Sequence, residues 1–339
     1  MSSYRSSKTP HCFNADGSDA LLSVKGLRTY FHTGEGVLKA VDDVSFHVKR
    51  GETFGIVGES GCGKSVACKS IVRLVLCPPG QYEAGEIIFD GRDTLKMSDS
   101  ELRSLRGGEI SFIFQEPMTA LNPVFTIGSQ IEEAIILHRK VGKSRAKEIA
   151  VDWIGKVRIP NPEAAFRRYP FTLSGGMRQR AMIAMALACQ PKLLIADEPT
   201  TALDVTIQAQ ILDLINAMKR ETGASCIFIT HDLGVISEMS DRVMVMYSGK
   251  VCETAATGEL IGNPLHPYTR GLIDSRPRGK RVGNRLVVIP GNVPSSRDKP
   301  SGCPFHPRCS EMKDICQRDF PPASEFGPEH LAYCWKYAR

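Results

Sequence analysis

The chain has 339 residues and a formal net charge of +6 at pH 7. This length exceeds that of one average domain, so we expect a main domain with an appendage. The modest charge favours a mixed, solvated surface over a surface for nucleic acid or anionic lipid. No apolar run approaches the ~18 residues of a membrane span, and the N-terminus lacks the pattern of a signal peptide. We therefore expect an intracellular protein that reaches a membrane only through a partner.

The first elements in chain order are a tail and an antiparallel β region. Residues 1–19 are rich in Ser and show no apolar period, which predicts a flexible tail. Apolar alternation from Leu21 and again from Ala40 predicts antiparallel strands. A short apolar run at 54–57 indicates a buried strand, and residues 65–75 read as a helix.

Between that strand and that helix, residues 58–65 read G-E-S-G-C-G-K-S. Gly58, Gly63, Lys64 and Ser65 fall where a phosphate-binding P-loop needs them. The glycines let successive N–H groups point at a polyphosphate, Lys64 supplies a positive charge, and Ser65 supplies a hydroxyl for Mg²⁺.

The later pattern predicts a parallel sheet. We expect strands at 86–89, 110–114, 193–196 and 226–229, with helices within 124–159, over 178–187 and over 206–219. The helix between the last two strands makes a βαβ unit, so those strands are parallel. Pro and Gly become frequent from about residue 262, which marks a domain boundary.

Two further stretches carry chemistry. Asp197 and Glu198 follow a buried strand, where Asp197 is placed to hold Mg²⁺ through water and Glu198 to polarise an attacking water. Their neighbours L-L-I-A and P-T-T-A-L-D favour this interpretation over plain solvated loop carboxylates. Ser174, Gly175 and Gly176 precede a helix and predict a second anion-binding helix N-terminus.

From about residue 20 to its C-terminus, the sequence resembles the ATP-binding subunits of ABC transporters. Residues 58–65 look like the Walker A motif, and L-L-I-A-D-E at 193–198 looks like the Walker B motif. The run L-S-G-G-M at 173–177 is similar to the signature motif, with Met177 where Gln is commoner, and T-A-L-D at 201–204 looks like the D-loop.

The resemblance implies an α/β fold with a RecA-like mixed sheet core, an antiparallel β subdomain and an α-helical subdomain at about 116–180. The ATPase domain would span 20–262, and a small Cys-rich C-terminal domain would span 263–339. The family mechanism requires two subunits that meet head to tail and bury two ATP molecules between them.

The resemblance also assigns roles residue by residue. ATP would bind Phe31, Gly58, Glu59, Ser60, Gly61, Cys62, Gly63, Lys64, Ser65 and Val66. Mg²⁺ would be served by Ser65, Gln115 and Asp197, and catalysis by Lys64, Gln115, Glu198 and His231. Ser174, Gly175, Gly176, Met177 and Gln179 would complete the partner's site, with Asp204 in the D-loop. Tyr30 is the alternative to Phe31 for stacking on adenine.

Three stretches look like the oligopeptide/dipeptide branch of importer ATPases, namely 118–123, 263–269 and 289–294. This branch imports di- and oligopeptides, and also nickel complexes, sugars or opines. The implied partners are a second ATPase, either a related chain or a copy of this one, two permease subunits and an extracytoplasmic substrate-binding protein. The chain would lie on the cytoplasmic face of the bacterial inner membrane, and no nucleic acid is expected.

Two other classes compete with this interpretation. A soluble ABC ATPase acting on nucleic acid or ribosomes usually carries two cassettes or a long coiled-coil insertion, and neither pattern is present. A metal-bearing interaction subunit with an inactive ATPase would not need Glu198 and His231.

Four of the 11 cysteines, Cys303, Cys309, Cys316 and Cys334, crowd a polar, Pro-rich C-terminal segment that cannot close by apolar burial alone. In a reducing compartment, thiolates point to iron-sulfur or zinc. The spacing lacks the C-x2-C knuckles of zinc sites, and the resemblance implies a [4Fe-4S] cluster. Zinc and unliganded thiols remain alternatives, with His306 as a spare ligand.

Overall fold

The computed structural model describes residues 20–201, 203–276, 281–282, 285–286, 288–295 and 297–338. The tail predicted for residues 1–19 lies outside the described residues.

An antiparallel sheet begins the fold. Its strands are β1 (Ala20–Thr33), β2 (Gly36–Lys49), β4 (Gly80–Phe89) and β5 (Arg92–Asp93), in the order β2-β1-β4-β5. The predicted antiparallel β region is therefore confirmed.

The main sheet is mixed and has the order β13-β14-β10-β9-β3-β8-β7-β6. Its strands are β3 (Thr53–Val57), β6 (Ile110–Ile113), β7 (Leu193–Asp197), β8 (Ser225–Thr230), β9 (Arg242–Tyr247), β10 (Lys250–Ala256), β13 (Ser324–Gly327) and β14 (His330–Ala332). Strands β6, β7, β8, β3 and β9 run parallel, so the segments after their carboxyl ends emerge at one edge.

Alternate residues of the main sheet face two different apolar cores. Ile195 and Ile227 belong to a core shared with β1, β2, α1 (Lys64–Ile71) and α2 (Asp99–Gly108). Leu194 and Phe228 belong to a second core shared with the later helices. The helix that follows the phosphate loop, residues 58–65, thus lies on the opposite face of the sheet from those later helices.

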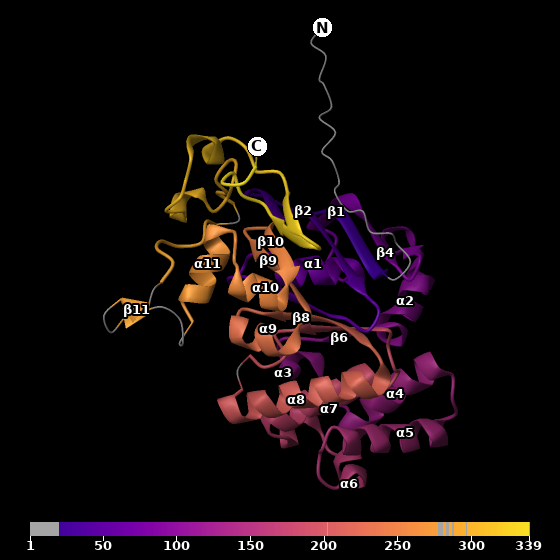
Figure 1. Ribbon diagram of the computed structural model, residues 1–339. Helices are drawn as coiled ribbons and strands as arrows, with labels where there is room; N and C mark the ends of the chain where they lie inside the picture. Colours follow the sequence, from indigo (N-terminus) through magenta and orange to yellow (C-terminus); the bar gives the residue numbers. More distant parts are fainter. Residues whose placement is uncertain are drawn as a thin grey trace.

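The later helices pack together on that second face, as Figure 1 shows for α4 to α8. They are α3 (Pro117–Ala120), α4 (Ile127–Arg139), α5 (Lys143–Lys156), α6 (Pro162–Phe166), α7 (Gly175–Leu187) and α8 (Val205–Thr222). The helix α9 (Leu233–Met239) follows β8. The mostly helical interval expected at 124–159 is confirmed, with a break between α4 and α5.

The predicted helix over 65–75 is too long, because α1 ends at Ile71. Val72 already leaves the helical conformation, and Arg73 adopts a left-handed one at φ 52°. The guanidinium of Arg73 donates to the carbonyl of Met97 at 2.7 Å. A contact between distant segments accompanies this helix end, and a local pattern does not reveal such a contact.

The chain beyond residue 262, which we call the C-terminal module, completes the main sheet. The predicted boundary lies between α10 (Thr257–Gly262) and α11 (Pro267–Asp274), and a hairpin of β11 (Arg281–Val282) and β12 (Arg285–Leu286) follows. Strand β14 then returns to pair with β10, beside which the module lies in Figure 1. The module and the rest of the main sheet are therefore joined by backbone hydrogen bonds.

A buried carboxylate strengthens this junction. Glu253 of β10 is fully buried and accepts hydrogen bonds from the backbone N–H groups of Leu265 and His266, each at 2.9 Å. His330 Nε2 lies 2.9 Å from the same carboxylate. Because a buried carboxylate is costly without such partners, the start and end of the module are both held to one residue of the core.

None of the helices among the described residues combines the length and the apolar character needed to span a bilayer.

Candidate functional site

The phosphate loop lies between β3 and α1 and closes around Lys64. The Lys64 ammonium donates to the carbonyls of Gly58 and Glu59, at 2.7 and 3.1 Å. A Cβ at Gly58 would lie 2.2 Å from the Met246 carbonyl oxygen, so only glycine fits there. Gly63 has φ +100°, a left-handed conformation that glycine adopts without steric cost.

The end of β7 brings an acid to the start of α1. The Ser65 hydroxyl donates to Asp197 Oδ1 at 2.8 Å. Burial raises the pKa of Asp197, and the hydrogen bond from Ser65 opposes that rise. A hydroxyl and a carboxylate side by side offer the hard oxygen ligands that Mg²⁺ prefers, so these two residues fit the ion.

Polar groups from several loops surround the Glu198 carboxylate. Its Oε2 accepts hydrogen bonds from Gln115 Nε2 at 3.3 Å and from the Thr201 hydroxyl at 2.9 Å. His231 Nδ1 lies 3.3 Å from the same oxygen, and the Lys64 ammonium lies 4.0 Å from Oε1. Glu198 itself has φ 46°, a left-handed conformation that costs a non-glycine residue of order 1–3 kcal/mol.

The structure thus brings together the predicted residues at the ends of β3, β6, β7 and β8. Sequence reasoning missed Thr201 as a partner of Glu198, although it lies in the D-loop stretch and only three residues farther along the chain. The sequence signal for this contact was the hydroxyl of Thr201, three positions after the acid Glu198.

Two cavities flank this cluster. One of about 500 Å³ is lined by Glu59, Ser60, Glu198 and His231 together with four residues of the C-terminal module. The other, of about 470 Å³, is lined by Ser65, Lys69, Asp197 and the segment around Gln115. Both lie beside the phosphate loop, where a nucleoside triphosphate and its metal would bind.

The second helix N-terminus lies apart from these cavities. Ser174 is exposed and caps α7 by accepting from the Met177 N–H at 3.4 Å. Asp204 caps α8 in the same way, accepting from the Ile207 N–H at 3.0 Å. Among the described residues that line the two cavities, none belongs to 174–177. The phosphate loop and the N-terminus of α7 are therefore two separate features of the chain.

Gln179 differs from the rest of the predicted signature set. Gln179 belongs to α7 and is buried, with 1 % of the residue's surface exposed, whereas Ser174 and Gly175 are exposed.

The two candidates for adenine stacking lie on opposite faces of β1. The Tyr30 hydroxyl donates to Asp42 at 2.6 Å, which fixes its ring. Phe31 lies two residues after Thr29 and therefore on the same face of β1. The Thr29 hydroxyl on that face lies 2.9 Å from the Ser70 hydroxyl in α1. Phe31 is half-buried and has no polar group to hold it elsewhere.

The four clustered cysteines lie within one module, but their side chains do not form a ligand set. Across the described ranges, no three His, Cys, Asp or Glu side chains are grouped as metal ligands. The Cys303 N–H donates to the Cys316 carbonyl at 2.9 Å. Burial raises the pKa of Cys303 to about 12, and the nearby thiols of Cys316, Cys334 and Cys309 contribute to the rise.

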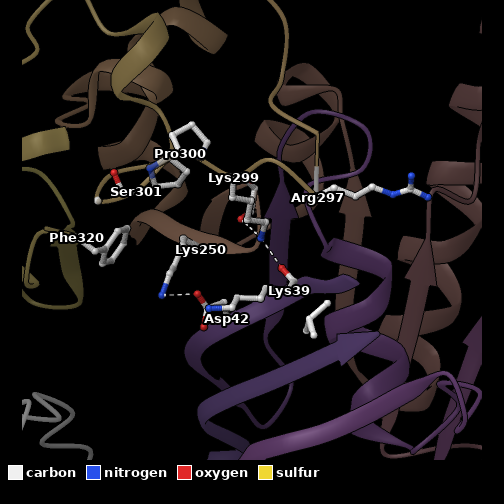
Figure 2. Close-up of a pocket in the computed structure, with 12 residues that line it drawn as sticks. Lys39, Asp42, Lys250, Arg297, Lys299, Pro300, Ser301 and Phe320 are labelled. Carbon is white, nitrogen blue, oxygen red and sulfur yellow. Dashed lines mark hydrogen bonds and ion pairs between the residues drawn. The ribbon is translucent and has the colours of Figure 1, made fainter. Parts of the chain in front are cut away.

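A third cavity, of about 390 Å³, lies between the β1–β2 hairpin, the β9–β10 turn and the C-terminal module (Figure 2). Lys250 pairs with Asp42 at 3.0 Å, and the Lys299 ammonium donates to the carbonyls of Lys39 and Ser248. Burial lowers the pKa of Lys299 to about 8. The basic groups of this cavity are therefore largely engaged within the chain.

The closed phosphate loop, the acids at the end of β7 and the histidine after β8 define a P-loop nucleoside triphosphatase. Residues 41–201 match the family described as ABC transporter, and residues 252–316 match the C-terminal region of the oligopeptide/dipeptide transporters. The chain belongs to the ATPases of ABC transporters.

Curated relatives match nearly the whole chain. A probable peptide ABC transporter ATP-binding protein of Sinorhizobium fredii, y4tR, is 51 % identical, covering 94 % of this chain and 96 % of its own. The dipeptide transport ATP-binding protein DppD of Bacillus subtilis is 47 % identical, covering 94 % and 95 %. The oligopeptide transport ATP-binding protein OppD of Escherichia coli is 47 % identical, covering 94 % of each chain.

Among solved structures, the chain is similar to the ATP-binding cassette MJ0796. One chain of its dimeric structure in a post-hydrolysis state, bound to ADP and phosphate, matches this chain with a TM-score of 0.63 and 28 % identity. The match covers 70 % of this chain and 98 % of that one. The fold class expected from the sequence is confirmed.

Proposed function

We propose that this chain is the ATP-hydrolysing subunit of an inner-membrane importer of di- or oligopeptides. The observation that carries the proposal is the combination, in one chain, of a complete ATPase cluster with a C-terminal region of the oligopeptide/dipeptide type. Relatives named for peptide transport over almost their whole length support the substrate class. A nickel complex, sugar or opine would use the same machinery, and no observation favours an action on nucleic acid or ribosomes.

Within the site, each residue takes a role that its contacts permit. Lys64 and the loop amides hold the β and γ phosphates, and Ser65, Asp197 and Gln115 serve Mg²⁺, directly or through water. Glu198 acts as the general base for the attacking water. Gln115, Thr201 and His231 surround its carboxylate, so they orient it toward the γ-phosphate position.

The second half of the site comes from another ATPase subunit. Because α1 and α7 lie on opposite faces of the sheet, Ser174 cannot complete the chain's own phosphate loop. The second subunit is a related chain or a second copy, and the two meet head to tail. The γ-phosphate of the ATP on the partner's phosphate loop then lies at Ser174, Gly175, Gly176 and Met177, with Asp204 beside them. A contact from Gln179 is not part of this proposal.

An exposed apolar surface supports docking to the permeases. Met118, Val124, Phe125 and Phe171 are each more than half exposed. Arg178 joins the two stretches because its guanidinium contacts Met118 Sδ and donates to the Pro170 carbonyl. Exposed apolar side chains on segments joined in this way favour an interaction site, which we assign to the two permease subunits. The chain then lies peripherally at the cytoplasmic face of the inner membrane, and the substrate-binding protein joins through the complex.

We propose a [4Fe-4S] cluster on the four cysteines, with zinc as the alternative. Their side chains are not grouped as ligands in the described residues, so the proposal requires that they come together when the cluster binds. Supporting this, four soft sulfur donors lie in one module, where burial, and to a smaller extent neighbouring thiols, raise the pKa of Cys303, Cys309 and Cys334. Bound iron would supply a structural crosslink to a module with few aliphatic residues.

The general-base assignment predicts the effect of Glu198→Gln. The amide cannot take a proton from water, so the turnover of Mg·ATP should fall by about 10²–10⁴-fold while ATP still binds. Phosphate release and ATP titration measure the two effects, with Glu133→Gln on the exposed surface of α4 as the control. Near-normal hydrolysis by Glu198→Gln would remove Glu198 from the role.

The stacking assignment predicts different effects for the two aromatic residues. Loss of a base-stacking ring costs about 1–3 kcal/mol, so Phe31→Ala should weaken ATP affinity by roughly five- to 150-fold. Tyr30→Ala should weaken it less. ATP titration of both variants checks this, and a larger loss for Tyr30→Ala would reverse the assignment.

The importer assignment predicts co-purification of the chain with two permease subunits. The double variant Phe125→Asp and Phe171→Asp should lose that association and peptide uptake while still binding ATP, because each charge interrupts the apolar surface. Leu76→Asp, at an exposed leucine of another segment, is the matched control. Retained assembly of the double variant would reject the docking surface, and recovery with ribosomes or nucleic acid would reject the importer.

The cluster assignment predicts a broad absorbance near about 400 nm in protein purified without oxygen, from thiolate-to-iron charge transfer. Iron and sulfide should both be stoichiometric, and Cys316→Ser should lose the absorbance. Cys226→Ser, a cysteine of the main sheet, should retain it. Stoichiometric zinc without iron or sulfide would contradict the assignment.

A further inference from the structure

An arginine of the C-terminal module reaches the phosphate loop. Arg308, which immediately precedes Cys309, has a side chain that is 5 % exposed. Its Nη1 donates to Glu59 Oε2 at 2.7 Å and its Nη2 donates to Glu59 Oε1 at 3.2 Å. This is a two-point pair with the residue that follows Gly58 in the loop, although the partners are separated by 249 positions.

The arginine is itself fixed on the opposite side. Its Nε donates to the Pro290 carbonyl at 2.8 Å, and its Nη1 also lies 3.2 Å from the Tyr247 hydroxyl of β9. A guanidinium bound through several of its N–H groups has little freedom, so it holds the Glu59 carboxylate in one orientation.

The module also binds the backbone of the same residue. The Glu59 N–H donates to the Tyr268 hydroxyl at 3.0 Å. The Tyr268 ring is fully buried and packs against Tyr247 and Phe305, with ring centroids 4.7 and 5.2 Å away. Both the side chain and the amide of Glu59 are therefore held by residues outside the segment that forms the loop.

A second set of contacts links the module to the loop. Lys299, also of the module, donates to the Ser248 carbonyl in the β9–β10 turn (Figure 2). The next residue in that turn, Gly249, donates its N–H to the Cys62 carbonyl at 2.9 Å. The module thus contacts the loop directly at Glu59 and through one intervening turn at Cys62.

Charge gives these contacts a consequence for ATP. Glu59 lines the cavity of about 500 Å³ together with Glu198 and His231. Its carboxylate would repel a polyphosphate bound there unless a cation compensates. We propose that Arg308 is a positioning residue of the ATP site, which neutralises Glu59 and holds the phosphate loop for ATP. This inference rests on the proposed ATP site and extends it to the C-terminal module.

A double-mutant cycle on the full chain tests the inference. Affinity for the non-hydrolysable analogue AMP-PNP with Mg²⁺ is measured for Arg308→Met, Glu59→Gln and the double variant, together with thermal unfolding of each. Arg308→Met should weaken affinity about tenfold, because it leaves the carboxylate unpaired. Adding Glu59→Gln should restore most of that loss, since the repelling charge is then gone.

The controls separate this role from general stability. Arg318→Met makes the same chemical change at an exposed arginine of the module and should leave affinity unchanged. If Arg308→Met unfolds, Arg308→Lys keeps the charge without the two-point geometry and should show a smaller loss, again reversed by Glu59→Gln.

Two outcomes would overturn the inference: unchanged affinity in Arg308→Met, or a loss that Glu59→Gln does not reverse in the Arg308→Met or Arg308→Lys background. Failure of the unaltered protein to bind AMP-PNP would instead count against the proposed ATP site. The two failures are therefore distinguishable.

Discussion

The closed loop around the Lys64 ammonium is the interaction on which the rest of the site depends. Its two carbonyl contacts to Gly58 and Glu59 keep the loop curled, so that its N–H groups can converge on one point. The loop keeps that shape because β3 lies between β8 and β9 and because Gly58 passes against the Met246 carbonyl of β9. The parallel strands then deliver Asp197, Glu198 and His231 to the same edge of the sheet.

The sheet also separates the phosphate loop from the N-terminus of α7. Successive residues of β7 and β8 face different cores, one with α1 and one with α7. A nucleotide on the phosphate loop therefore needs a second subunit to be enclosed, and the dimeric cassette to which this chain is similar has the same class of fold. Under the proposed function, ATP binding joins two subunits and hydrolysis releases them, and the permeases sense that change through the apolar surface near Phe125.

Local sequence patterns predicted much of the site but little of the junction between the C-terminal module and the rest of the chain. Glycine spacing predicted the loop, and apolar runs ending in acids predicted β7 and its acid pair, because each of these signals lies within about ten residues. The pairing of β14 with β10 and the contact of Arg308 with Glu59 join residues far apart in sequence, and their partners depend on how the chain closes. The stretch 263–269, which contains Tyr268, indicated only a resemblance, since nothing local shows that the Tyr268 hydroxyl accepts the Glu59 N–H.

The phosphate loop is held by the C-terminal module as well as by the sheet. Amide hydrogen exchange of residues 58–65, compared between the unaltered protein and Arg308→Met without nucleotide, tests this most directly. We predict faster exchange in this loop and in residues 304–309, with α4 and α5 unchanged. Unchanged exchange in the loop, with faster exchange confined to the module, would contradict the account.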